Sequence, residues 1–483
     1  MMIALKNIDE DLRKEFQRLS DDFWDFKESD TKELTHSIHN YPAVMVYPIS
    51  RNILNIVKKY EKLTSLMDPF MGSGTVLLEG VLAGISDIYG NDLNPLAHRI
   101  SKAKTTLLDK IELEKGKRQL LSLLEQSYFE YKEVLLEVDG YVQNCGYDIT
   151  AKVNEKENWG AKAPQILNAF IETKGKSLKI PEITNLGFWF VPTVIIELQL
   201  IKHAISRIQN EDVKEYFEVV FSETTRLVSN RRNGEFKMYR MPPEKVKVYK
   251  PNVKEQFIKI LNSNVEKMCA LQERVTNDNK SKVHFSFDDA ASLESVPDDS
   301  IDIVITSPPY GDSRTTVAYG QFSRVSLQWC DYEKYSYKDI IDIDKKLMGG
   351  KSYKKGFENN ICSKILKDSL LEIMSSADNL ERAGDVYSFY KDLQDIMQTV
   401  TQKCRINSYQ FWVVGNRTVK GVQLMTSDII VEMAKTMGLV HVTTLERNIT
   451  NKVMPSLNSP TNEPGKKVKT MNEELIVVLR KGE

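Results

Sequence analysis

A short apolar strand, a tight glycine turn and a helix follow one another between residues 64 and 83, and this combination constrains the fold more than any other feature. The turn contains Gly72 and Gly74, which permit positive φ angles and let a ligand lie against bare backbone. The N-terminus of the following helix favours a negatively charged group. Together these parts predict the first unit of a nucleotide-binding α/β sheet.

An acidic residue at the end of the next predicted strand supports this interpretation. Residues 85–92 have the pattern of a strand ending in Asp92, and the distance from Gly74 is close to the spacing of about 20 residues at which an acid meets ribose hydroxyls. A plainer alternative is that Asp92 only caps the helix that begins near Pro95. We expect Asp92 to contact a bound nucleoside.

A second motif, Thr306-Ser307-Pro308-Pro309-Tyr310, follows residues 301–305, which have the pattern of a buried parallel strand. Neither proline has an N–H group, so the backbone carbonyls of this turn remain free to accept hydrogen bonds from another molecule. The ring of Tyr310 supplies a flat face. A planar base that carries an exocyclic amino group fits such a pocket wall.

Further strand patterns complete an α/β fold. Apolar runs occur at residues 283–287, 411–416 and 474–479, and Asp289 follows the first of them, where it would face the same nucleoside as Asp92. We therefore predict an α/β fold, a Rossmann-like sheet with helices on both faces, together with a largely helical insertion.

The chain divides into three predicted parts. Residues 1–108 hold an N-terminal helix and the first half of the sheet domain. Residues 281–483 hold its second half, with a helical insertion at 331–400. Residues 109–280 form an inserted helical and basic region, and the 483-residue chain is long enough to contain it. This region is predicted to recognise the target, and a share of that task for residues 331–400 and 448–470 remains an open alternative.

The inserted region contains a strongly basic segment. Between residues 226 and 254 there are nine basic residues and two acidic ones, with aromatic residues interleaved. This combination favours contact with nucleic-acid phosphates and bases, and the alternative is a solvated basic face without a partner. The predicted nucleic-acid contacts are Arg226, Arg231, Arg232, Lys237, Arg240 and, in the loop after Tyr310, Arg314.

Composition is that of an ordinary globular protein, with 41% hydrophobic and 28% charged residues and a formal net charge of -1. No apolar run approaches the roughly 20 residues that cross a membrane, and no secretory signal is recognisable, so no membrane contact is expected. The five cysteines lie far apart without a C-x-x-C pair, which favours reduced thiols in the cytoplasm. His36 and His39 lack the further ligands of a metal site, so no metal is expected.

Taken together, these stretches resemble the amino-group DNA methyltransferases, which use S-adenosylmethionine to methylate cytosine N4 or adenine N6. Residues 68–75 look like the cofactor motif of that family, and residues 306–310 look like its catalytic motif in the serine-first form that is more typical of N4-cytosine members. Residues 39–42 are similar to the segment that closes over the methionine end of the cofactor. The resemblance covers roughly residues 35–105 and 281–483.

The resemblance implies a set of site residues. Ser307, Pro308, Pro309 and Tyr310 would be catalytic. The acidic positions that hold the ribose and adenine match Asp92 and Asp289. The full set of implied cofactor contacts is Tyr41, Pro42, Asp68, Phe70, Gly72, Gly74, Thr75, Asp92, Leu93, Asp289 and Ala290.

The implied function is site-specific transfer of a methyl group to N4 of a flipped cytosine in double-stranded DNA, within a restriction-modification or related defence system. A cognate restriction endonuclease or other defence subunits are then candidate partners. Ser307 Oγ and the Pro308 carbonyl would each accept one amino hydrogen, which frees the nitrogen lone pair for an in-line displacement.

Three alternatives remain open at this stage. The same chemistry can act on adenine N6, or a related site can methylate RNA or protein. A third alternative is a non-catalytic DNA-binding subunit that keeps the fold. The intact Gly72, Gly74, Ser307 and Tyr310 argue against the third, because binding alone does not need all of them.

Overall fold

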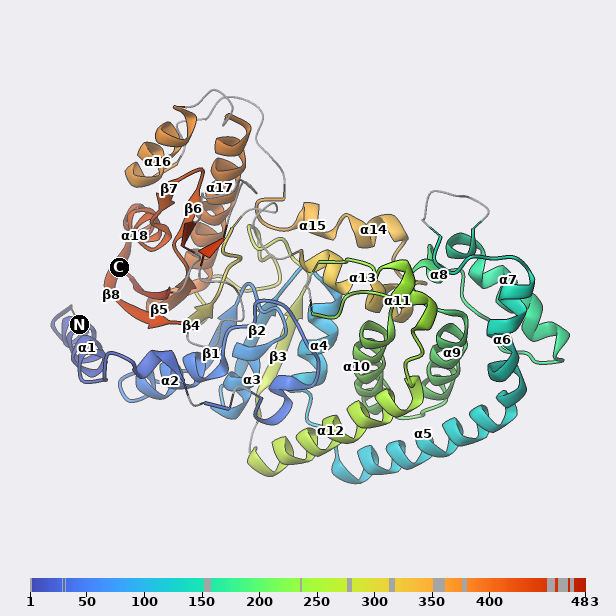
Figure 1. Ribbon diagram of the computed structural model, residues 1–483. Helices are drawn as coiled ribbons and strands as arrows, with labels where there is room; N and C mark the ends of the chain where they lie inside the picture. The colour runs from blue at the N-terminus through green and yellow to red at the C-terminus, as the bar shows by residue number, and fades with distance from the viewer. Residues whose placement is uncertain are drawn as a thin grey trace.

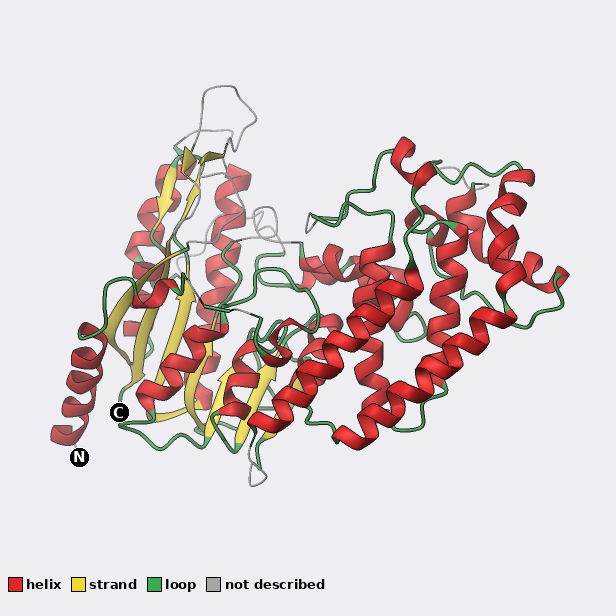
Figure 2. Cartoon of the chain, turned by 60° about the horizontal axis from the view of Figure 1, so that its bottom comes forward, coloured by secondary structure: helices red, strands yellow, loops and turns green. Residues whose placement is uncertain are grey.

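A seven-stranded sheet forms the centre of the protein (Figures 1 and 2). This computed structural model describes residues 2–27, 29–30, 32–151, 158–234, 237–275, 280–311, 318–350, 361–375, 380–449, 457–458, 468–469 and 473–483. The strand order is β3 (Lys282–Ser286), β2 (Asp87–Asn91), β1 (Ser65–Asp68), β4 (Ile301–Thr306), β5 (Cys404–Val414), β11 (Glu473–Lys481) and β8 (Leu439–Asn448). Strand β11 runs antiparallel to both neighbours, and the other neighbouring pairs are parallel.

Both faces of the sheet are buried, which explains the nearly continuous apolar runs of its strands. In β4, Ile303 and Ile305 point into one core, and Ile301 and Val304 point into the other. The first core is covered by α1 (Met2–Gln17), α2 (Tyr47–Val57) and α3 (Thr75–Leu82), and the second by α16 (Lys364–Met374), α17 (Leu380–Lys403) and α18 (Thr426–Thr436). The predicted α/β fold with helices on both faces is confirmed.

Between β2 and β3 the chain leaves the sheet through α4 (Pro95–Thr105) and forms a large group of helices. Their buried side chains, such as Leu120 and Phe217, belong to the same continuous core as Leu77 of α3. Figure 2 shows the strands on one side of the molecule and this helical group on the other. Its members are α5 (Lys110–Glu130), α6 (Lys132–Asn144), α7 (Trp159–Thr173), α8 (Leu186–Trp189), α9 (Pro192–Ser206), α10 (Glu211–Val228), α11 (Pro243–Val248) and α12 (Val253–Arg274).

Shorter elements complete the fold. A small cluster that includes Tyr41 and Phe322 joins α4 to α13 (Tyr319–Cys330), α14 (Tyr337–Ile341) and α15 (Ile343–Lys346). Two 3-10 helices, η1 (Phe23–Asp25) and η2 (Leu34–Ser37), lie near the N-terminus. The strand pairs are β6 (Arg417–Val419) with β7 (Val422–Leu424), and β9 (Leu457–Asn458) with β10 (Val468–Lys469). Among the described residues no helix is long and apolar enough to span a bilayer.

The pairing of β1 with β4 positions the site. These strands lie side by side and parallel, with Leu66 opposite Ile303 and Met67 opposite Val304. The order of the strands along the chain reverses at this pair, because β2 and β3 lie on one side and β5 on the other. In open α/β sheets, ligands bind beyond the carboxyl ends of the strands at such a reversal. The turns that follow β1 and β4 therefore open on the same crevice.

Candidate functional site

The two motifs are joined directly by a hydrogen bond. Asp68, the last residue of β1, accepts the Thr306 hydroxyl at 2.7 Å from the end of β4. The same Asp68 oxygen accepts the backbone N–H of Phe70 at 3.0 Å, which starts the turn toward α3. Burial raises the pKa of Asp68 to about 7. Asp68 thus fixes the start of the glycine turn against the start of the Ser307 turn.

The glycine turn depends on two positive φ angles, 48° at Gly72 and 74° at Gly74. A Cβ atom at Gly74 would lie 2.8 Å from the Cβ of Ser101 and 3.0 Å from its Cα, so no side chain fits there. The hydroxyl of Ser101, on α4, donates to the Gly72 carbonyl at 2.9 Å. The close approach of α4 therefore holds the turn in place.

Asp92, which follows β2, lies against this turn. Its carboxylate accepts the N–H of Gly72 at 3.1 Å and the N–H of Asn94 at 2.8 Å. The residue that caps α4 is Asn94, whose side chain accepts the Leu96 N–H. The alternative in which Asp92 only caps this helix is therefore wrong. Burial raises the pKa of Asp92 to about 6, although its hydrogen bonds act in the opposite direction.

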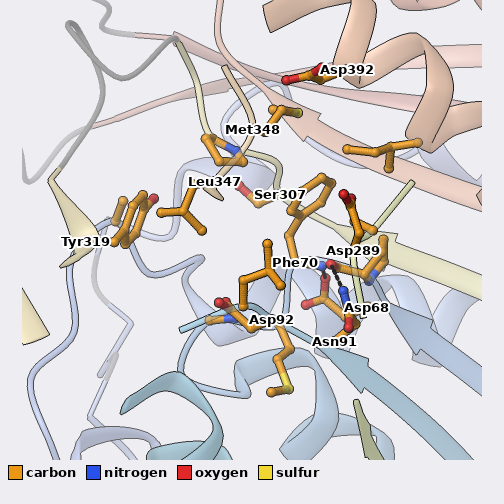
Figure 3. Close-up of a pocket in the computed structure, with 18 of the residues that line it drawn as sticks. Asp68, Phe70, Asn91, Asp92, Asp289, Ser307, Tyr319, Leu347, Met348 and Asp392 are labelled. Atoms are coloured by element: carbon orange, nitrogen blue, oxygen red, sulfur yellow. Dashed lines mark hydrogen bonds between the residues drawn. The ribbon is translucent and has the colours of Figure 1, made fainter. Parts of the chain in front are cut away.

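A cavity of about 400 Å³ opens between these turns (Figure 3). Its wall contains every predicted cofactor residue except Gly74, and it contains Ser307 and Pro309 from the catalytic motif. Pro308 and Tyr310 are not part of the wall. In Figure 3, Tyr319 and Leu347 face Phe70 and Asp289 across the cavity. Residues from eight separate stretches of the sequence thus surround one space.

Several wall residues were not predicted from the sequence. Lys345 to Met348, after α14, and four residues of α17, including Asp392, complete the side of the cavity opposite the glycine turn. Asp392 accepts the N–H of Gly349 at 2.9 Å, and this bond joins the two segments. The signal in the sequence that could have pointed to this segment is the Gly349-Gly350 pair, which is typical of a hinge or mobile loop. The region 331–400 therefore contributes to the cavity.

The segment that carries Tyr41 and Pro42 is fixed by two histidines. His36 Nε2 lies 2.8 Å from Glu79 of α3, and its ring stacks on Tyr47. His39 Nε2 lies 3.0 Å from Ser222 Oγ of α10. Burial lowers the pKa of both histidines, so they are neutral and structural near pH 7.

The predicted nucleic-acid contacts separate into buried and exposed residues. Arg226 is 3% exposed and pairs with Glu223 at 3.0 Å, and Arg231 is 1% exposed with its guanidinium 5.3 Å from the centre of the Phe322 ring. Arg240 donates to the carbonyls of residues 149–151 and stacks on Phe188. These three predictions need correction, because the guanidinium groups serve internal contacts and are not presented to phosphates.

Other basic residues of the segment are exposed. Arg232 and Lys237 lie in solvent, as do Lys245, Lys247 and Lys250 in and after α11. The ring of Tyr239 is 48% exposed beside them. We call Arg232, Lys237, Lys245, Lys247 and Lys250 the exposed basic set. Arg314 lies outside the described residues.

Comparisons with known proteins agree with this architecture. The chain is 37% identical to the type II methyltransferase M.MvaI of Kocuria varians over 462 residues, which cover 94% of this chain and 93% of that protein. It is 25% identical to the type II methyltransferase M.MjaII of Methanocaldococcus jannaschii over 225 residues, 42% of this chain and 41% of that protein. No protein-family model matches the chain, and no solved structure matches it significantly. The extent of the first similarity establishes that this chain belongs to the type II methyltransferase family.

Proposed function

We propose that this protein transfers a methyl group from S-adenosylmethionine to the exocyclic N4 of a flipped cytosine at a specific site in duplex DNA. The observation that carries the proposal is the parallel pairing of β1 and β4, because it brings the glycine turn and the Ser307 turn to one cavity. The type II methyltransferase relatives support it. The serine-first catalytic motif favours cytosine N4 over adenine N6.

The cavity suits S-adenosylmethionine in size and in chemistry. Its volume falls in the range of small-ligand sites. Among the described residues, the buried hydroxyl of Thr75 has no hydrogen-bond partner, and it lies at the N-terminus of α3, where a carboxylate is stabilised. Asp92 would accept the ribose hydroxyls, and Phe70 with Asp289 would hold the adenine.

When bound, S-adenosylmethionine would supply a methyl group carried on a positively charged sulfur. The amino nitrogen would take this methyl carbon, the electron pair of the broken carbon–sulfur bond would stay on sulfur, and one amino proton would pass to water. An exocyclic amine is a poor nucleophile because its lone pair is delocalised into the ring. Ser307 Oγ and the Pro308 carbonyl each accept one N–H, which directs the lone pair out of the ring plane.

The target base must leave the duplex to reach Ser307, at a cost of a few kcal/mol. Stacking on an aromatic side chain returns about 1–3 kcal/mol. Tyr310 is proposed for this role, with its half-buried ring meeting the base outside the described cavity, whose wall it does not form. The exposed basic set would contact the DNA phosphates, giving an affinity that depends on salt. The proposed setting is a restriction-modification or related defence system with a cognate endonuclease.

The direct test is to incubate the purified protein and S-adenosylmethionine with genomic DNA and, in parallel, with RNA or with protein. The products are digested and analysed by mass spectrometry. We expect N4-methylcytosine. N6-methyladenine would move the same chemistry to adenine, and methylation of RNA or protein alone would reassign the substrate. No methylated product of any kind would favour a non-catalytic DNA-binding subunit.

The matched control is Ser307→Ala. Removal of one of two acceptors is expected to slow product formation about 100-fold. The cofactor Kd by calorimetry should not change, because Ser307 belongs to the catalytic turn and not to the glycine turn. An unchanged rate would exclude Ser307 from the reaction.

A further inference from the structure

Ser307 is the first member of a hydrogen-bond chain that leads away from the cavity. Its Oγ lies 3.2 Å from the hydroxyl of Tyr310, and that hydroxyl lies 2.9 Å from Glu474 Oε1 on β11. Ser307 lines the cavity, whereas Tyr310 and Glu474 do not. The chain therefore connects the proposed acceptor to an ionisable group behind the wall.

Glu474 is held by Arg447. The two residues face one another on the antiparallel strands β11 and β8, and their side chains form an ion pair. The Glu474 side chain is 13% exposed and that of Arg447 is 7% exposed. Arg447 Nε also donates to the carbonyl of Trp24, in η1, at 2.9 Å. One carboxylate oxygen of Glu474 is thus occupied by Arg447, and the other receives Tyr310.

The chemistry of these groups determines which of them donates and which accepts in each hydrogen bond. An ionised carboxylate only accepts, so the single hydroxyl hydrogen of Tyr310 points to Glu474. The Tyr310 oxygen can then only accept from Ser307, so the single hydrogen of Ser307 points away from the cavity. Burial raises the pKa of Tyr310, and the charge of Glu474 raises it further, so the phenol keeps the proton that this arrangement needs.

We infer that Glu474, held by Arg447, is a positioning residue that keeps Ser307 Oγ a hydrogen-bond acceptor toward the substrate amino group. This inference rests on the proposed function. The Pro308 carbonyl can only accept, but a freely rotating serine hydroxyl can present either its hydrogen or its lone pairs. An amino group presents two N–H donors, so a hydrogen of Ser307 turned toward it would oppose the required geometry.

The critical variant is Glu474→Gln. Arg447 can bond only to the amide oxygen, so the amide N–H is left to donate to Tyr310. The direction of donation along the hydrogen bonds then reverses, because Tyr310 donates to Ser307 and the hydrogen of Ser307 turns toward the cavity. We expect the single-turnover rate of methyl transfer to DNA to fall roughly tenfold, the size of one lost neutral hydrogen bond. The affinities for S-adenosylmethionine and DNA should stay within about twofold of wild type.

A double-mutant cycle separates this role from a structural one. Tyr310→Phe keeps the ring but removes the link between Glu474 and Ser307. In that background, Glu474→Gln should cause no further loss of rate, because the reversed direction can no longer reach Ser307. The same loss in both backgrounds, or a wild-type rate for Glu474→Gln alone, would overturn the inference.

A spectroscopic readout keeps the test independent of the methylated base. With 3-fluorotyrosine at position 310, the fluorine resonance of the full-length protein should shift on Glu474→Gln and on Ser307→Ala. A resonance unaffected by both changes would contradict the chain, whatever the substrate. If the wild-type protein forms no methylated product, the proposed function fails, and the resonance alone then decides whether the chain exists.

Discussion

The crevice between β1 and β4 and the basic segment of residues 226–254 both carry the chemistry that their proposed roles need, but their side chains point in different directions. In the crevice, Asp68, Asp92 and Ser307 all line one cavity. In the basic segment, Arg226 and Arg231 are buried in internal contacts, whereas the exposed basic set lies in solvent. The side chains of the crevice meet at one site, whereas those of the basic segment are partly buried in the core and partly exposed on the surface.

The difference shows what a motif must contain to locate a site. In the crevice, the ends of paired strands and two glycines with positive φ fix the backbone, and the backbone directs the side chains. The sequence of the basic segment carries no comparable backbone signal, and a long guanidinium stem can fold back onto a ring such as Phe322 or Phe188. Charge density alone therefore says little about which residues meet a ligand.

The largest expected effect is that of Arg226→Ala on stability. This change leaves Glu223 buried without its guanidinium partner, which typically costs about 3–5 kcal/mol. Thermal unfolding should show a clearly lower midpoint than wild type, whereas Lys245→Ala, at an exposed position, should change stability by less than about 0.5 kcal/mol. Equal midpoints for the two variants would erase the distinction between the buried and exposed basic residues.

Gly74→Ala is expected to weaken cofactor binding at least tenfold. The positive φ costs about 1–2 kcal/mol in a residue with a Cβ, and Ser101 must also move away. The matched control is Gly84→Ala, because Gly84 has a φ of 69° but open space around the new Cβ. Calorimetry should show an unchanged cofactor Kd for the control. A Gly74→Ala protein with wild-type affinity would show that the glycine turn is not part of the site.

Cofactor binding should weaken as the pH falls. Burial raises the pKa of Asp92 to about 6, so this carboxyl takes up a proton as the pH drops through that value and stops accepting from ribose. Affinity should be constant well above pH 6 and decline by up to about tenfold per unit below it. Asp92→Asn should bind more weakly and lose this step. A dependence that remains near pH 7 would come from Asp68 or from buried Lys104, because the pKa of each is about 7.

The smallest expected effect is that of removing exposed lysines on DNA affinity. Lys245→Ala and Lys247→Ala should each lower the slope of log K against log salt by about 1, with little effect on sequence preference. Lys282→Ala serves as the control, because Lys282 is exposed at the amino end of β3, away from the crevice. Fluorescence anisotropy over a salt series measures these slopes. If all three variants match wild type, the exposed basic set does not bind DNA.

Much of the crevice was predictable from the sequence because its signals are local. Gly72, Gly74 and the two prolines report backbone constraints, and the apolar run before Thr306 reports a buried strand whose end lies beside β1. The wall that contains Met348 and Asp392 was not predictable, because the two segments, joined by the bond from Gly349 to Asp392, meet only through tertiary packing. That Arg226 is buried and Lys245 exposed was not predictable for the same reason, because burial depends on residues distant in the sequence.

Amide hydrogen exchange followed by mass spectrometry tests the central claim most directly, because one measurement reports on both regions. We expect S-adenosylhomocysteine to slow exchange in the segments 69–76, 91–94 and 289–292, which surround the cavity, and to leave segment 243–250 unchanged. Duplex DNA should then slow exchange in segment 243–250. Protection by S-adenosylhomocysteine elsewhere, with these cavity segments unaffected, would contradict the assignment of the β1–β4 crevice as the methyl-donor site.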